Sequence, residues 1–85
     1  MRLNSYNLNG YELDLDTDVL KKYGELTGEE FGSEELNASL SWLGKMMTET
    51  DSFEEAVNKV GLEELAKLII RAIKNELSDL FGEEI

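Results

Sequence analysis

Cysteine, histidine and proline are all missing from this chain. Without cysteine there is neither a disulfide framework nor a thiolate metal site. Without histidine the chain lacks the commonest general base near neutral pH and the commonest metal ligand. No apolar run is long enough to span a membrane, and the opening MRLNSYNLNG lacks the apolar core of a signal peptide. We therefore expect a cytoplasmic protein that needs no metal or cofactor and does not sit in a membrane.

Basic residues are also scarce. Eight lysines and arginines face nineteen aspartates and glutamates, which gives a net charge of -11 over 85 residues. Such a surface repels nucleic acid and favours basic partners. The length suits a single domain, residues 1–85, and a domain of this size buries only about 60–65% of its unfolded surface. We expect marginal stability, so that contacts with a partner matter.

Residues 3–15 have the pattern of a β-hairpin. Asn9-Gly10 is the favoured pair for a two-residue type I′ turn, because both positions need positive φ. The flanking residues alternate between apolar and polar, as strands with one buried face do. Leu3 falls out of phase, which predicts a bulge or a frayed end. The turn predicts three cross-strand pairs: Leu8 with Tyr11, Tyr6 with Leu13, and Asn4 with Leu15.

Three short helices are predicted after the hairpin. Each has a side chain able to cap its first turn, and the first and third have a residue typical of a helix end. Gly24 and Gly44 lie inside the first two helices and weaken their patterns. In the first helix the candidate caps are Asp16, Thr17 and Asp18, the end signal is Thr27-Gly28, and the apolar side is Val19, Leu20, Tyr23 and Leu26. Ser33 opens the second helix. Ser52 and Glu55 form a capping box at the start of the third, and Gly61 ends it.

Residues 62–81 form the longest helical pattern. At about 100° per residue its apolar residues form one stripe with broad flanks, so we interpret this helix as the central element of the core. Gly82 follows it, where a left-handed C-cap is expected. The order ββαααα predicts an α+β fold, an N-terminal hairpin followed by about four helices. The stripe is Leu62, Leu65, Ala66, Ile69, Ile73, Leu77 and Leu80, flanked by Leu68, Ile70, Ala72 and Phe81.

Several apolar residues exceed what the small core requires. In the second helix Leu36, Leu40, Leu43 and Met47 make one stripe, and Ala38, Trp42 and Met46 make another. Large apolar residues at helical spacing usually belong to the core, but tryptophan and methionine are also enriched at interfaces. The last helix likewise carries more apolar surface than three short helices and a hairpin can cover. The candidate partner-binding residues are Trp42, Met46, Leu68, Ile70 and Phe81.

The carboxylates include one pattern that resembles a calcium loop. Asp14, Asp16, Asp18 and Glu25 have the spacing of EF-hand ligands. However, Val19 occupies the position that needs glycine, and a strand rather than a helix precedes Asp14. We therefore interpret these residues as a strand end and a helix cap. The acidic pairs elsewhere lie at helix starts or ends, where acidic residues are expected for dipole reasons. Without histidine or cysteine, no nucleophile–base pair can be assembled except an unusual serine–lysine arrangement, so an enzyme is not expected.

One stretch resembles a known family. Residues 7–31, NLNGYELDLDTDVLKKYGELTGEEF, are similar to the opening of small phage tail assembly chaperones. The resemblance implies a non-catalytic protein that binds the long, aggregation-prone tape measure protein, a largely helical partner, while the tail tube assembles. The matching residues are Asn9, Gly10, Tyr11, Leu13, Leu15, Tyr23, Glu25, Leu26, Thr27, Gly28 and Phe31.

Two alternatives stay open at this point. The net charge suits an acidic inhibitor that mimics nucleic acid and blocks a host nuclease or DNA-binding protein. Interspersed basic residues count against it, among them Lys67, Arg71 and Lys74 on the outer side of the last helix. The other alternative is a homo-oligomer built through that helix.

Overall fold

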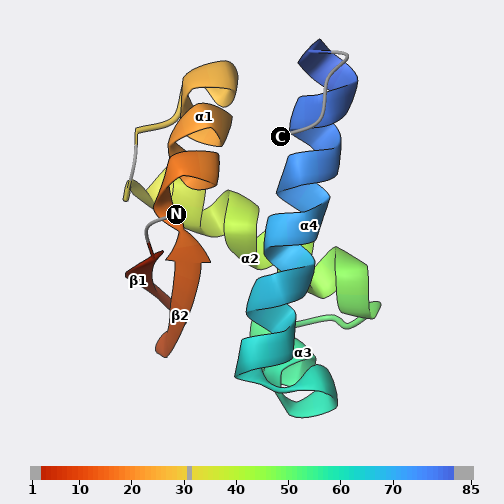
Figure 1. Cartoon of the computed structure of the whole chain (residues 1–85). Coiled ribbons are helices and arrows are strands. Elements are labelled where there is room, and N and C mark those ends of the chain that lie inside the picture. The colour runs from red at the N-terminus through yellow and green to blue at the C-terminus, as the bar shows by residue number, and fades with distance from the viewer. Residues whose placement is uncertain (1–2, 31, 82–85) are drawn as a thin grey trace.

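The computed structural model describes residues 3–30 and 32–81, with side chains as far as Asp79. Phe31, Gly82 and the side chains of Leu80 and Phe81 thus lie outside the described residues. The predicted α+β class is confirmed, because an antiparallel hairpin precedes four helices (Figure 1). The elements are β1 (Leu3–Leu8), β2 (Tyr11–Asp16), α1 (Thr17–Thr27), α2 (Glu34–Thr48), α3 (Phe53–Val60) and α4 (Leu62–Phe81).

The hairpin has the predicted turn and register. Asn9 and Gly10 have φ values of 53° and 90°, and all three predicted cross-strand pairs are present. The expected bulge at Leu3 is wrong, because Leu3 pairs with Asp16 in regular register. Its side chain is 62% exposed, since its phase places it on the strand face opposite to Tyr6 and Leu8.

Side-chain caps start the first three helices as predicted. The Asp16 carboxylate accepts hydrogen bonds from the N–H groups of Asp18 and Val19, and Gly28 ends α1 in the left-handed conformation. Ser33 caps α2. Ser52 caps α3 by accepting from the N–H of Glu55 at 3.1 Å. The capping box differs in one bond, because the Glu55 carboxylate accepts from the N–H of Asp51 instead of Ser52.

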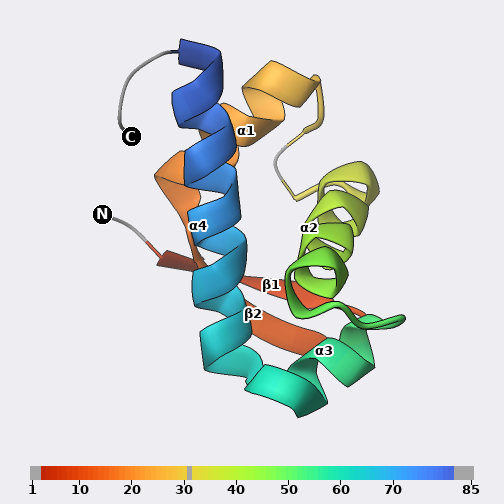
Figure 2. The same ribbon diagram turned by 90° about the vertical axis from the view of Figure 1, so that its right-hand side faces the viewer.

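α4 is the central element of the core. It contacts β2, α1, α2 and α3, and Figure 2 shows it in front of the hairpin, with α1 near one end and α3 near the other. The core is continuous and draws on all six elements. The centre of the predicted α4 stripe is fully buried: Leu65, Ile69, Ile73 and Leu77.

One predicted core residue of α1 is exposed. Leu26 has 42% of its surface accessible, whereas Val19, Leu20 and Tyr23 are buried. Gly24 is buried too, because the loop returns over it and the Glu29 N–H bonds its carbonyl at 2.9 Å. The buried face of α1 is therefore shifted toward Leu20 and Gly24. Leu26 lies about 90° from the centre of that face at 100° per residue.

Candidate protein-binding surfaces

The outward side of α2 carries an apolar stripe that no other part of the described chain covers. Trp42 is 55% exposed and Met46 49% exposed, and Ala38, one turn before Trp42, is exposed as well. We call Ala38, Trp42 and Met46 the α2 stripe. Residues four apart on a helix lie on the same face, so the three side chains form one continuous surface.

The position of the α2 stripe follows from the way α2 packs. Leu36, Leu40 and Leu43 face the core and are at most 4% exposed. Trp42 lies about 200° round the helix from Leu40 at 100° per residue, which places it on the opposite side. Trp42 and Met46 are therefore surface residues, although large apolar residues at helical spacing usually belong to the core. Met47, expected on the buried stripe, is 39% exposed because it belongs to the last turn of α2, next to the chain reversal at Glu49.

Acidic side chains bracket the α2 stripe. Glu35 precedes Ala38 by one turn, and Glu49 follows Met46 by one turn; both are exposed. At 1.5 Å per residue, the fourteen-residue interval between the two glutamates spans about 21 Å. A partner laid along α2 therefore meets an apolar surface with a carboxylate at each end.

Leu68 and Ile70, the other candidates whose side chains the structure describes, do not share one face of α4. Leu68 and Ile70 are both half-buried on α4, but they lie about 200° apart round the helix. Ile70 lines a groove between α4 and β2, and Leu68 does not. The side chain of Phe81 lies outside the described residues. The five candidates thus belong to at least two faces of the molecule.

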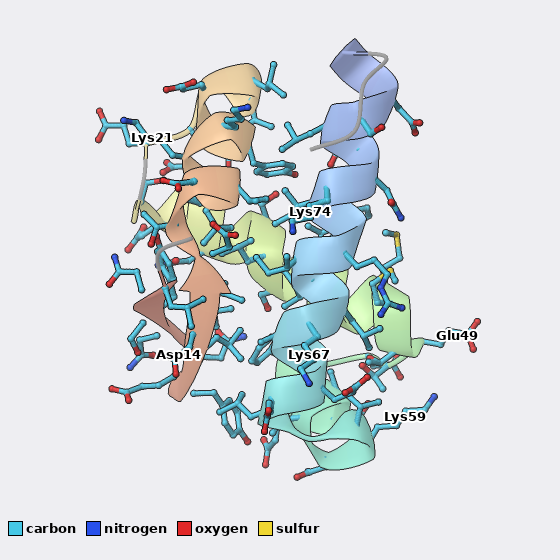
Figure 3. All side chains as sticks on the ribbon, viewed as in Figure 1. Asp14, Lys21, Glu49, Lys59, Lys67 and Lys74 are labelled. Atoms are coloured by element: carbon cyan, nitrogen blue, oxygen red, sulfur yellow. The ribbon has the colours of Figure 1, made fainter. Side chains whose placement is uncertain are left out.

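The groove beside Ile70 is large and open to one side. Its volume is about 1160 Å³. We call it the β2/α4 groove. Figure 3 shows Asp14 on β2 and Lys67 and Lys74 on α4 on the two sides of this region. Its lining residues are Leu3, Glu12, Leu13, Asp14, Asp16, Leu62, Glu63, Ala66, Lys67, Ile70, Arg71, Lys74, Asn75 and Ser78.

The two walls of the β2/α4 groove have opposite charge. Its β2 wall carries three carboxylates, including Glu12 and Asp14, and its α4 wall carries Lys67, Arg71 and Lys74. Between the walls lie apolar side chains such as Ile70. Lys67 also pairs with Glu63 on its own helix at 3.8 Å. Helical periodicity placed these basic residues on the outer side of the last helix, but no sequence pattern indicated the groove, because a groove depends on how β2 and α4 pack.

The residues that have the spacing of calcium ligands have other roles in the structure. Asp16 is nearly buried and caps α1, Asp14 is an exposed strand residue, and Glu25 lies on the third turn of α1. The interpretation as a strand end and helix cap is confirmed. Within the described ranges, no three carboxylates lie close enough together to hold a metal ion.

Comparisons with protein-family models, with curated proteins and with solved structures found no match to this chain. Among the helices that the structure describes, none is long and apolar enough to cross a membrane.

Proposed function

We propose that this protein is a non-catalytic binding protein that holds a helical segment of a protein partner on the α2 stripe. The observation that carries the proposal is the exposure of Trp42 and Met46 on the side of α2 opposite the core. Exposed apolar surface of this kind marks interaction sites. Tryptophan is the residue type most enriched among interface hot spots, and methionine adapts its shape to different partners.

A helix suits this surface better than other partner shapes. The α2 stripe is a straight row of side chains with a four-residue spacing, and such rows pack against the apolar stripe of a second helix. The partner stripe is expected to have lysine or arginine near each end, facing Glu35 and Glu49. These ion pairs lie at the rim of the interface, so they contribute orientation more than affinity.

We propose further that the partner is a phage tape measure protein and that the chain acts as a tail assembly chaperone. The resemblance over residues 7–31 supports this setting, and long helical partners fit the α2 stripe. The resembling residues that the structure describes precede α2 in the chain, and two of them, Asn9 and Tyr23, hydrogen-bond with Ser41 and Ser39 of α2. None of them belongs to the α2 stripe, so the stripe is an independent reason to propose a helical partner.

Co-expression with the tape measure protein encoded in the same genome tests the proposal. We expect the two proteins to purify together and the tape measure protein to stay soluble. Because Trp42 is the sole tryptophan, its fluorescence reports on this surface directly, and burial by the partner should shift the emission to shorter wavelength. Trp42→Ser with Met46→Ser should abolish association. Leu26→Ser, which changes another exposed apolar residue on α1, should leave it intact.

A salt titration separates this proposal from the acidic inhibitor. Apolar contacts should keep the affinity nearly constant up to about 0.5 M salt, where the Debye length falls below about 5 Å. A loss of affinity by several orders of magnitude, insensitive to the Trp42 and Met46 changes, would instead support a mimic of nucleic acid. Recovery of a nuclease or DNA-binding protein in place of the tape measure protein would contradict the proposal in the same way.

A further inference from the structure

Among the described residues, β2 has a free edge with unused backbone hydrogen-bonding groups. The sheet that these residues form consists of β1 and β2, so β2 pairs with a described strand on one side alone. Leu8 and Tyr11 flank the two-residue turn and form its hydrogen-bonded pair. Hydrogen-bonded and non-hydrogen-bonded pairs then alternate along the ladder. Glu12 and Asp14 fall in non-hydrogen-bonded pairs, so their N–H and C=O groups point away from β1.

This edge faces the β2/α4 groove. Glu12, Leu13 and Asp14 all line the groove. In the part of the chain that the structure describes, no backbone hydrogen bond from a helix or loop reaches Glu12 or Asp14. An exposed row of this kind is a template for pairing with another extended chain. The groove gives such a chain a place to lie, between the free edge and α4.

We propose that the β2/α4 groove binds an extended segment of a protein partner, which adds to β2 as a third strand with alternating apolar and basic side chains. This site is separate from the α2 stripe and does not depend on the function proposed above. Its main-chain hydrogen bonds would supply affinity and its side-chain contacts specificity, as in other cases of strand addition.

The pattern of the bound segment follows from the two faces of β2. Leu13 points into the core and is 1% exposed, whereas Glu12 and Asp14 are exposed on the other face. In an added strand, the residues directly opposite Glu12 and Asp14 lie on the same face of the sheet as these two carboxylates. A basic residue there forms a cross-strand pair of opposite charge, which is stabilising. The intervening residues point toward α4, where Ile70 and Ala66 present apolar surface. Lysine or arginine should therefore alternate with apolar residues.

The basic side chains of the α4 wall can also bind the added strand. Lys67, Arg71 and Lys74 lie across the groove from β2, beside the edge that an added strand would expose. Ammonium and guanidinium groups are hydrogen-bond donors only, so they can donate to the outer carbonyl oxygens of that strand.

A second copy of this chain is a poor occupant. Pairing of β2 with another β2 would bring Glu12 and Asp14 of both copies onto one face. Like charges directly opposite each other destabilise a sheet. The acidic wall also repels nucleic acid. These charges favour a basic strand from a different protein.

Blocked peptides provide the first test. The probe is Lys-Val-Lys-Val-Lys-Val-Lys, acetylated and amidated at its ends, and the control is Lys-Lys-Lys-Val-Val-Val-Lys, which has the same composition and charge. In the free protein, the amides of Glu12 and Asp14 should exchange with deuterium quickly, and those of Leu13 and Leu15 slowly. The probe should slow exchange at Glu12 and Asp14 by at least about tenfold, as hydrogen bonding does. If both peptides slow the exchange equally, they bind through charge alone, and the proposal is overturned.

N-methylation tests the backbone hydrogen bonds without changing the charge. In antiparallel addition the lysine N–H groups bond to Glu12 and Asp14, and in parallel addition the valine N–H groups do. Methylation of one set should abolish binding while methylation of the other is tolerated. A probe that binds equally well with either set methylated would contradict strand addition.

Charge reversal on β2 completes the test. Asp14→Lys should lower the affinity for the lysine probe by at least about tenfold, because it places like charges opposite each other. It should also allow binding of the peptide in which glutamate replaces each lysine of the probe. Glu25→Lys makes the same change in net charge at an exposed position of α1 outside the groove, so it is the matched control. An equal loss of affinity in both variants would overturn the proposal.

Discussion

Gly44 of α2 lies directly against the ring of Phe53 at the start of α3. A β-carbon on Gly44 would be 3.1 Å from Cε1 of Phe53 and 3.4 Å from Cδ1 of Leu65. Both neighbours are almost fully buried and have little room to move. The glycine, which weakened the helical pattern in the sequence, thus permits the close approach of α2, α3 and α4.

We expect Gly44→Val to destabilise the fold by about 2–3 kcal/mol, because the added carbons overpack the contact with Phe53. Urea unfolding followed by circular dichroism measures the change. Ala38→Val is the control, since Ala38 is exposed on the same helix and only helix propensity changes, by about 0.5 kcal/mol. Equal losses in the two variants would show that the contact is not tight.

Ile73→Asp should unfold the protein. Ile73 is fully buried at the centre of the α4 stripe, and an unpaired charge there costs several kcal/mol, about as much as the stability of a small domain. Asn75→Asp adds the same charge at an exposed position of α4 and should melt almost like the unchanged protein. A cooperative melting transition for Ile73→Asp would show that α4 does not organise the core.

Tyr6 should make the protein sensitive to alkaline pH. Burial raises the pKa of the Tyr6 hydroxyl, an effect that a hydrogen bond with the Asn4 side chain partly offsets. Because the pKa is higher in the folded state, the contribution to stability is complete below the unfolded value of about 10. It is lost as the pH rises through the folded value. Tyr6→Phe should therefore reduce the fall in unfolding free energy above pH 10. If the slope of the unfolding free energy against pH is the same in Tyr6→Phe, Tyr6 is not the cause of the alkaline sensitivity.

Calcium should not stabilise the protein. One oxygen of Asp16 already caps α1 by accepting from the N–H groups of Asp18 and Val19, and the spacing that resembles an EF-hand contains Val19 where glycine is required. We expect the melting temperature to be the same with and without sub-millimolar Ca²⁺, with Mg²⁺ as the control. A rise of several degrees specific to Ca²⁺ would show preferential binding to the folded state.

Local sequence signals determined the elements and their ends. The hairpin register follows from Asn9-Gly10, because a two-residue turn leaves a single way to pair the flanking strands. The starts of α1, α2 and α3 follow from side chains that can reach an N–H in the first turn. The centre of α4 follows from helical periodicity. In each case the deciding interaction spans only a few residues, so the order of residues is sufficient.

The candidate surfaces depended on contacts between distant segments. Periodicity showed that Trp42 and Met46 share a face of α2, but only the packing of α2 decided that Leu40 faces the core and Trp42 does not. The central α4 stripe is covered by the chain's own elements, whereas three of the five large apolar side chains that are exposed in the described structure lie on α2. The β2/α4 groove exists because α4 leaves one edge of β2 uncovered. Which side of an amphipathic element meets the core is decided by the shape of its neighbours, and that information lies in the tertiary structure.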